Sequence, residues 1–260
     1  MGDFKYKKAF GQNFIKDDNI VKKIANLSGV DKDTLVIEIG PGGGSLSKYI
    51  VPLAGYTIMY EIDTRVEPML KEVLGGNDNY EIIFGDFLKQ DTSKIRDQYG
   101  NKKIYVIANL PYYITTPIIT KLLNESYPDK LIIMVQKEVA MRLSANYGSR
   151  DYGMISVLLG ARYTIKKLFD VSRKSFIPEP NVDSAVIELT KNDRLGNTNF
   201  DVFERLIKDA FQFKRKNLRN NLKGYDLLKI EKVLKKNNYS LLNRAEDIPV
   251  EVFGEIAREL

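Results

Sequence analysis

The sequence predicts an α/β fold in which helices cover a mostly parallel sheet of about seven strands, followed by a small helical domain. Short runs rich in Val, Ile and Leu alternate with segments long enough for crossover helices. These runs are apolar throughout instead of alternating, which is typical of strands covered on both faces. Beyond residue 191 the runs stop, and amphipathic helical patterns replace them.

Five runs account for the parallel part of the sheet, at residues 35–39, 57–62, 81–84, 104–108 and 131–135. Two more segments, near Thr164 and at 184–189, are predicted as extra strands. We expect both to be antiparallel additions at the edge of the sheet.

The polar stretch after Lys191 marks the expected domain boundary. Residues 1–191 are therefore expected to form the sheet domain, and residues 192–260 a small, basic helical domain. Its helices are predicted at 201–211, 214–222, 225–236 and 250–259.

The chain of 260 residues contains no Cys, His or Trp. Without thiols and imidazoles, Cys nucleophiles, Ser-His-Asp triads, His general bases, thiolate zinc sites and iron–sulfur clusters are excluded. No apolar leader opens the sequence, and no apolar run is long enough to cross a membrane. We expect a cytoplasmic monomer that needs no metal.

Positive charge is concentrated in the expected helical domain. Between Arg205 and Lys236 there are eleven Lys or Arg residues and three acidic ones, although the whole chain carries a net charge of only +6. Such an excess favours a polyanionic partner, because phosphate neutralisation supplies most non-specific affinity for nucleic acid. A solvated helical face is the alternative.

A glycine-rich turn follows the first predicted strand, in the sequence Glu38-Ile39-Gly40-Pro41-Gly42-Gly43-Gly44. Glycine permits a tight turn and a close approach of the backbone to a ligand. The pattern of nicotinamide-dinucleotide sites is not met, because position 45 is Ser and Pro41 lacks a backbone donor. An ordinary strand-to-helix turn is the alternative.

Acidic side chains stand at the ends of the next two predicted strands. Glu61 ends the second strand, where one carboxylate can accept hydrogen bonds from both ribose hydroxyls of a nucleotide. Asp86 follows the third strand, where an acceptor can bind the amino group of an adenine. For Glu61 the alternative is a plain surface acid.

The fourth strand ends in the most specific motif of the chain, Asn109-Leu110-Pro111-Tyr112. The Asn109 carboxamide and the Leu110 carbonyl, which Pro111 holds outward, can both accept hydrogen bonds from an exocyclic amine. Tyr112 offers a flat face on which a base can stack. Two acceptors on the amine protons would favour its nucleophilic geometry and stabilise the cation formed when it attacks a methyl group.

With these motifs the chain resembles the ribosomal-RNA adenine N6,N6-dimethyltransferases of the bacterial kasugamycin-sensitivity type, which use S-adenosylmethionine. The resemblance extends over nearly the whole chain, in the expected order. The matching segments are residues 10–15, 38–42, 85–86, 109–115, 176–184 and 213–222. Departures are small: Ile15 stands where the family usually has Leu, and Gly43-Gly44 where bulkier residues are common.

The resemblance implies a Rossmann-like methyltransferase sheet and specific contacts. The implied cofactor contacts are Asn13 and Ile15 from an N-terminal covering segment, Gly40 beside the methionine part, Glu61 on the ribose, Asp86 on the adenine and Asn109 beside the reacting methyl. The implied contacts with the target adenine are Asn109, Leu110 and Tyr112, with Phe176 stacking on its other face. Contacts with RNA are expected from Lys214, Arg215, Lys216 and Arg219.

The expected reaction is in-line displacement, in which the adenine amine attacks the sulfonium methyl and S-adenosylhomocysteine leaves. No general base is needed for the attack, because the sulfonium is already activated. The target base must leave its stack to reach such a pocket, which favours a single-stranded loop. The resemblance therefore implies two adjacent adenosines in a 3′-terminal hairpin loop of small-subunit (16S) rRNA, in the assembling small ribosomal subunit.

Four alternatives stay open. The erythromycin-resistance branch dimethylates large-subunit (23S) rRNA, but Leu110, residues 113–115 and the basic tail look more like the small-subunit branch. A DNA adenine methyltransferase would normally have two prolines where only Pro111 stands. A non-catalytic assembly factor would retain the cofactor pocket without using it for catalysis. A small-molecule N-methyltransferase would account for the pocket but leave the basic segment unexplained.

Overall fold

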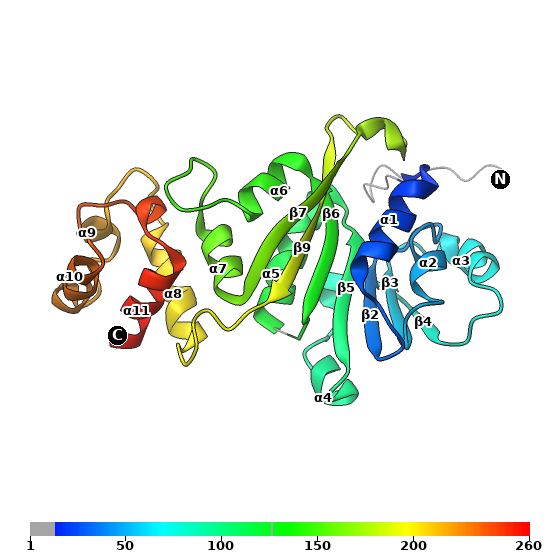
Figure 1. The fold of residues 1–260 in the computed structure, drawn as a ribbon, viewed down its shortest axis with the longest axis horizontal. Helices are drawn as coiled ribbons and strands as arrows, with labels where there is room; N and C mark the ends of the chain where they lie inside the picture. The colour runs from blue at the N-terminus through cyan, green and yellow to red at the C-terminus, as the bar shows by residue number, and fades with distance from the viewer. Residues whose placement is uncertain (1–13, 126) are drawn as a thin grey trace. The chain divides into compact units, whose positions relative to one another are not determined.

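Seven strands of the computed structural model, which describes residues 14–125 and 127–260, form one sheet (Figure 1). Their order across the sheet is β4-β3-β2-β5-β6-β9-β7. The strands are β2 (Thr34–Ile39), β3 (Tyr56–Glu61), β4 (Tyr80–Phe84), β5 (Lys103–Asn109), β6 (Lys130–Gln136), β7 (Tyr163–Val171) and β9 (Ser184–Lys191). The α/β fold expected from the sequence is confirmed.

Five of the strands run parallel and one neighbour runs against them. β2 pairs in parallel with β3 and β5, β3 with β4, and β5 with β6, whereas β9 is antiparallel to β6. The five predicted parallel strands and the antiparallel strand at 184–189 are therefore confirmed. Because β9 lies between β6 and β7, only β7 forms this edge of the sheet.

The register brings three polar side chains to one face. Glu38 on β2 lies opposite Met59 on β3 and Ile107 on β5. Since side chains alternate along a strand, Glu61 and Asn109, two residues further on, point to the same face as Glu38. The parallel strands thus present these side chains near their shared carboxyl end.

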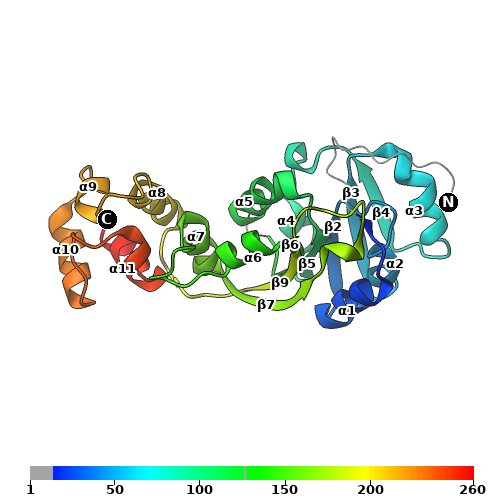
Figure 2. The ribbon, with the colours of Figure 1, turned by 90° about the horizontal axis from the view of Figure 1, so that it is seen from above.

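Helices cover both faces of this sheet. α1 (Asp18–Ser28) lies on one face, and α4 (Ile95–Tyr99) and α5 (Thr115–Glu125) lie on the other (Figure 2). Three further helices connect strands of the sheet: α2 (Ser47–Ile50), α3 (Glu67–Val73) and α6 (Lys137–Leu143). Apolar residues spaced three and four apart on α1, such as Val21, Ile24 and Ala25, pack in one buried cluster with Val36 of β2 and Ile107 of β5.

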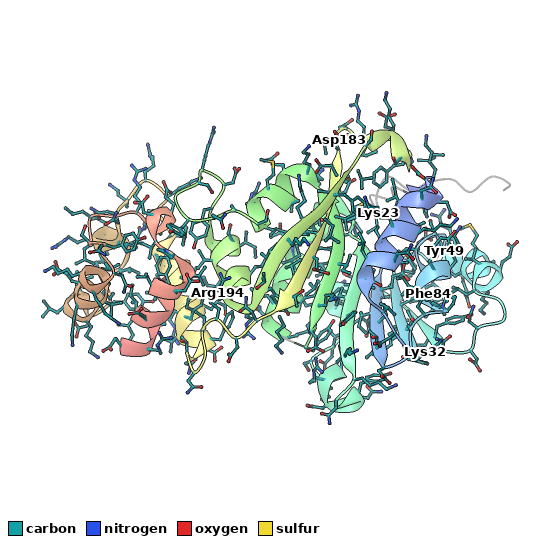
Figure 3. The ribbon with its side chains drawn as sticks, in the orientation of Figure 1. Lys23, Lys32, Tyr49, Phe84, Asp183 and Arg194 are labelled. Carbon is teal, nitrogen blue, oxygen red and sulfur yellow. The ribbon has the colours of Figure 1, made fainter. Side chains whose placement is uncertain are left out.

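Ion pairs fix α1 against its neighbours. Asp17 caps the helix by accepting from the Asn19 backbone, and the Asp18 carboxylate accepts from Lys48, Lys22 and the Tyr49 hydroxyl. These partners lower the pKa of Asp18, with Lys48 contributing most. Further along α1, the Lys23 ammonium lies 4.1 Å from the ring centroid of Phe169; Lys23 and Tyr49 are both labelled in Figure 3.

A second, two-stranded sheet joins two distant segments of the sequence. β1 (Phe14–Ile15) pairs antiparallel with β8 (Phe176–Ile177), with Ile15 opposite Phe176. The Lys16 backbone N–H also donates to the Ser175 carbonyl at 2.9 Å. The sequence did not predict this sheet, because two-residue strands have no periodicity to detect.

The chain divides into two compact units, residues 1–140 with 166–190 and residues 141–165 with 191–260. The sequence placed residues 141–165 in the sheet domain, whereas these contacts group them with the C-terminal helices. The physical reason is α7 (Met154–Arg162), a largely apolar helix that packs against α8 (Phe200–Ala210) and α11 (Val250–Glu259). The functional assignment of the two segments stays a prediction.

The second unit is helical and has its own core. α9 (Leu218–Asn221) and α10 (Leu227–Lys236) complete its helices. Phe211 packs against Tyr152 and Phe253, with ring centroids 6.3 Å and 6.2 Å apart. The four predicted C-terminal helical segments overlap α8, α9, α10 and α11, one helix each. Nowhere in 14–125 and 127–260 is a helix long and apolar enough to cross a membrane.

Candidate active site

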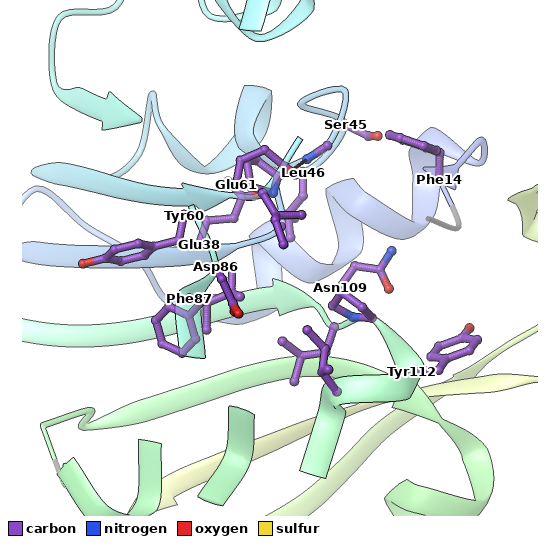
Figure 4. A pocket seen from close by; sticks show the side chains of 18 of the residues that line it. Phe14, Glu38, Ser45, Leu46, Tyr60, Glu61, Asp86, Phe87, Asn109 and Tyr112 are labelled. Atoms are coloured by element: carbon purple, nitrogen blue, oxygen red, sulfur yellow. Dashed lines mark hydrogen bonds between the residues drawn. The ribbon is translucent and has the colours of Figure 1, made fainter. Parts of the chain in front are cut away.

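One cavity gathers side chains from the carboxyl ends of four neighbouring parallel strands (Figure 4). Seven of the residues singled out from the sequence line it: Ile15, Gly40, Glu61, Asp86, Asn109, Leu110 and Tyr112. In open α/β sheets, ligands bind outside the carboxyl ends of the strands. The structure therefore brings together residues that lie almost a hundred positions apart in the chain.

The glycine-rich turn forms one wall of the cavity. The Gly40 backbone N–H donates to the Tyr60 carbonyl at 2.8 Å, which continues the contact between β2 and β3. Gly42 has a φ of +56°, and a Cβ added there would lie 2.7 Å from Cε1 of Phe14. Glycine is therefore required at position 42, both for its conformation and for the approach of the Phe14 ring.

Glu61 is held rigidly at the end of β3. Its Oε2 accepts from the Gly42 backbone N–H at 2.9 Å and its Oε1 from the Asp63 N–H at 2.8 Å. Asp63 in turn accepts from the Arg65 guanidinium at 2.6 Å. Burial raises the pKa of Glu61, and the backbone hydrogen bonds oppose the shift. The Ile62 backbone also donates to this carboxylate, and because a carboxylate can accept about four hydrogen bonds, Glu61 can still accept from a ligand hydroxyl.

Glu38 lies beneath the same turn and is 2% exposed. Its Oε2 has no hydrogen-bond partner in the described part of the chain. Burial, reinforced by the neighbouring Glu61 carboxylate and opposed by the Ser47 hydroxyl, raises the pKa of Glu38 to about 8. The sequence showed Glu38 as part of the glycine motif but did not mark it as a cavity residue.

Asp86 and Phe87 form the wall beyond β4. Asp86 caps the short 3₁₀ helix η3 (Phe87–Lys89), because its Oδ1 accepts from the Leu88 backbone N–H at 3.0 Å. This bond leaves Oδ2 available to a ligand donor. The Phe87 ring meets Tyr60 edge-on at a centroid distance of 5.2 Å, which gives the cavity a flat apolar side next to the carboxylate.

The Asn109-Leu110-Pro111-Tyr112 motif leads out of β5 into the 3₁₀ helix η4 (Tyr112–Ile114). The Leu110 N–H donates to the Met134 carbonyl at 3.1 Å, and the Leu110 side chain is buried. Thr115 Oγ1 donates to the Pro111 carbonyl at 2.9 Å, which fixes the turn. The Tyr112 hydroxyl lies 2.6 Å from Ser184 Oγ on β9.

The remaining predicted site residues are placed differently. Phe176 is 1% exposed, belongs to the same apolar cluster as Ile15 and does not line the cavity in this structure. Its stacking on a target base stays a prediction. Asn13 lies outside the described residues, although the adjoining Phe14 and Ile15 do reach the cavity.

Several lining residues were not predicted, among them Phe14, Ile62, Phe87 and Tyr113. The only available signal was position: Ile62 is the last residue of the expected strand 57–62, and Phe87 lies shortly after the expected strand 81–84. No group of acidic side chains in the described segments is arranged to hold a metal ion. That the protein needs no metal stays a prediction.

Some basic residues of the second unit form ion pairs and others do not. Lys208, Lys235 and Lys236 pair with Glu204, Glu231 and Glu255. The exposed cations of the loop between α8 and α9 and of α9 itself have no ion-pair partner within the described residues. These are Lys214, Arg215, Lys216 and Arg219. Their charge is therefore available to phosphates, which favours the polyanion interpretation over a solvated, internally paired face.

Comparisons with known proteins agree over nearly the full chain. The sequence model of a family described as ribosomal RNA adenine dimethylase matches residues 3–260. A protein named ribosomal RNA small subunit methyltransferase A from Alkaliphilus oremlandii is 42% identical over 267 residues, which is 99% of this chain and 93% of that protein. Its namesake from Oceanobacillus iheyensis is 38% identical over 264 residues, covering 98% and 90% of the two chains.

Solved structures extend the similarity to the fold. A dimethyladenosine transferase from Plasmodium falciparum superposes with a TM-score of 0.78 at 25% identity, over 94% of this chain and 95% of the other. The 23S rRNA methyltransferase ErmE gives 0.77 at 24% identity, over 95% and 99%. At that identity, the second similarity concerns the fold alone.

Proposed function

This chain belongs to the ribosomal RNA adenine dimethylase family, and from that membership we propose that it is an S-adenosylmethionine-dependent rRNA adenine N6-dimethyltransferase. Its proposed substrate is small-subunit (16S) rRNA, at two adjacent adenosines of a 3′-terminal hairpin loop, and its product is N6,N6-dimethyladenosine. The relatives named small subunit methyltransferase A favour this substrate over the large-subunit alternative.

The observation that carries the proposal is the meeting of Glu61, Asp86 and the Asn109–Tyr112 motif in one cavity. The lining fits an adenosine with an attached amino-acid chain. Glu61 provides a fixed acceptor for ribose hydroxyls, Asp86 Oδ2 an acceptor for an adenine amino group, and Phe87 and Ile62 an apolar surface for the ring. The glycine turn leaves room beside Gly40, where an added Cβ would meet nothing within 4 Å.

When bound, S-adenosylmethionine supplies a methyl group on an activated sulfonium. The chain's own residues position and polarise the target. The Asn109 carboxamide oxygen and the Leu110 carbonyl accept the protons of the adenine amine, which directs its lone pair outward. Tyr112 provides the stacking face, and buried apolar side chains such as Leu110 limit the access of water. The proton lost after transfer goes to water, so the reaction needs no His general base, and the chain contains no His.

We also propose that the second unit binds RNA through its unpaired cations and that the protein acts as a cytoplasmic monomer on the assembling small subunit. An assembly factor without catalysis is the rival from another class. It would bind RNA and cofactor but transfer no methyl group.

The test is methyl transfer from labelled S-adenosylmethionine to under-methylated small and large ribosomal subunits, side by side. The RNA is then digested to nucleosides and the modified position mapped. We expect N6,N6-dimethyladenosine near the 3′ end of the small-subunit RNA. The same product in the large subunit would contradict the proposed substrate, and no product on either would favour the assembly factor.

A further inference from the structure

The loop between α8 and α9, residues 211–217, carries two phenylalanines with opposite environments. Phe211 points inward and packs on Tyr152 and Phe253. Phe213, two residues later, is 56% exposed. The Phe213 ring, beside a partly buried phenylalanine, therefore forgoes the about 1.5–3 kcal/mol that its burial would contribute to stability.

The loop conformation holds Phe213 outward. The Phe213 carbonyl accepts from the Lys216 backbone N–H at 2.9 Å and from Asn221 Nδ2 at 3.3 Å. Asn221, which is 8% exposed, also donates to the Ala210 carbonyl at 2.6 Å. The buried side chains of Leu218 and Leu222 anchor the helix that follows. The ring is thus presented on an ordered turn.

Positive charge follows this ring closely in the sequence. Lys214, Arg215 and Lys216 follow it directly, all are exposed, and none has an ion-pair partner in the described part of the chain. The next exposed cation, Arg219, is fixed by its backbone N–H, which donates to the Leu241 carbonyl at 2.9 Å. An aromatic face among cations that lack acidic partners is the combination that binds an unpaired nucleotide, with the ring on the base and the cations on its phosphates.

We propose that Phe213 is a stacking contact for an unpaired base of the RNA, beyond the base that enters the active-site cavity. This inference rests on the proposed function in that the RNA is its substrate. It adds that the second unit distinguishes a single-stranded loop or bulge from a continuous duplex, which phosphate contacts alone do not do.

Because the chain contains no Trp, Phe213→Trp introduces a single indole that reports directly on stacking. We expect an RNA hairpin with an unpaired loop to quench its emission, and a blunt duplex of equal length to leave it unchanged. Leu228→Trp, at an 80% exposed position on α10, is the matched control and should respond to neither RNA.

Affinity provides the second readout. Phe213→Ala should weaken hairpin binding roughly fivefold to a hundredfold without changing the dependence on salt, because stacking releases no counterions. Lys214→Glu with Lys216→Glu should instead flatten the salt dependence for hairpin and duplex alike. Unquenched Phe213→Trp, or wild-type hairpin affinity in Phe213→Ala, would overturn the proposal. Both readouts are independent of methyl transfer, whose failure in the wild-type protein would count only against the proposed function.

Discussion

The hydroxyls of Tyr112 and Ser184 lie 2.6 Å apart, although the two residues are 72 positions apart in the chain. Tyr112 is the proposed stacking surface for the target adenine, and Ser184 opens β9 with no exposed surface. The hydrogen bond fixes the rotation of the tyrosine ring relative to the sheet. Burial raises the pKa of Tyr112, so the phenol stays protonated and can take part in this bond throughout the neutral range.

We expect Tyr112→Phe and Ser184→Ala each to lower kcat/KM roughly twofold to tenfold, since a hydrogen bond of this kind contributes about 0.5–1.5 kcal/mol. The double variant should be no worse than the poorer single one, because both changes remove the same bond. Steady-state kinetics on under-methylated subunits measures all three.

Tyr56→Phe, at the opposite end of β3 from Glu61, is the control for loss of a tyrosine hydroxyl and should leave kcat/KM unchanged. Thermal unfolding of each variant separates lost positioning from lost stability. Losses that simply add in the double variant would show that the two hydroxyls act independently.

The sheet could be predicted because each parallel strand is a continuous apolar run. The order of the strands and the small β1–β8 sheet could not be predicted. Contacts between distant residues, such as Ile15 and Phe176, form only in the folded chain and leave no local pattern in the sequence. The grouping of α7 with the C-terminal helices was missed for a related reason. Its apolar residues indicate burial but do not say against which neighbour.

The polar half of the site could be predicted because Glu61 and Asn109 end a strand and Asp86 follows one, and parallel strands end at a common edge. The apolar half was largely missed. Phe14 lines the cavity from the short strand β1 and Tyr113 from the 3₁₀ helix η4, two elements that the sequence did not predict. The structure also adds the reason why Glu61 is fixed, namely its two bonds to the backbone at Gly42 and Asp63.

Asn109→Ala should reduce the rate of methyl transfer by roughly a hundredfold to a thousandfold, the usual effect of removing one group that stabilises developing charge. RNA affinity should stay within about twofold, because the basic loop that we propose for RNA binding is untouched. Single-turnover transfer and equilibrium RNA binding measure the two quantities. Asn101→Ala, an exposed change just before the same strand, is the control. Near-wild-type turnover of Asn109→Ala would contradict the proposed role of the Asn109 side chain.

Gly42→Ala should weaken binding of S-adenosylhomocysteine, because the new methyl group would lie 2.7 Å from the Phe14 ring and displace it from the cavity wall. Phe14→Leu in the same background should restore part of the affinity, as a shorter side chain leaves room. Gly76→Ala also places alanine at positive φ, +87°, but meets no atom within 4 Å, so it isolates backbone strain. Calorimetric titration gives the affinities. Equal binding by Gly42→Ala and Gly76→Ala would contradict the steric argument.

Glu38 makes the stability of the fold depend on pH in an unusual direction for a carboxyl group. Its pKa is raised from 4.5 to about 8, so between these values the folded protein binds a proton that the unfolded chain has lost. The contribution of Glu38 to stability is therefore complete below pH 4.5 and declines as the pH rises towards 8.

Glu38→Gln keeps a neutral side chain of similar size at every pH. We expect the stability of the wild type relative to this variant to fall by more than about 1 kcal/mol between pH 5 and pH 8, the equivalent of about one pKa unit. Urea unfolding of both proteins at several pH values measures this difference. A difference that stays constant across the range would mean that Glu38 ionises normally despite its burial.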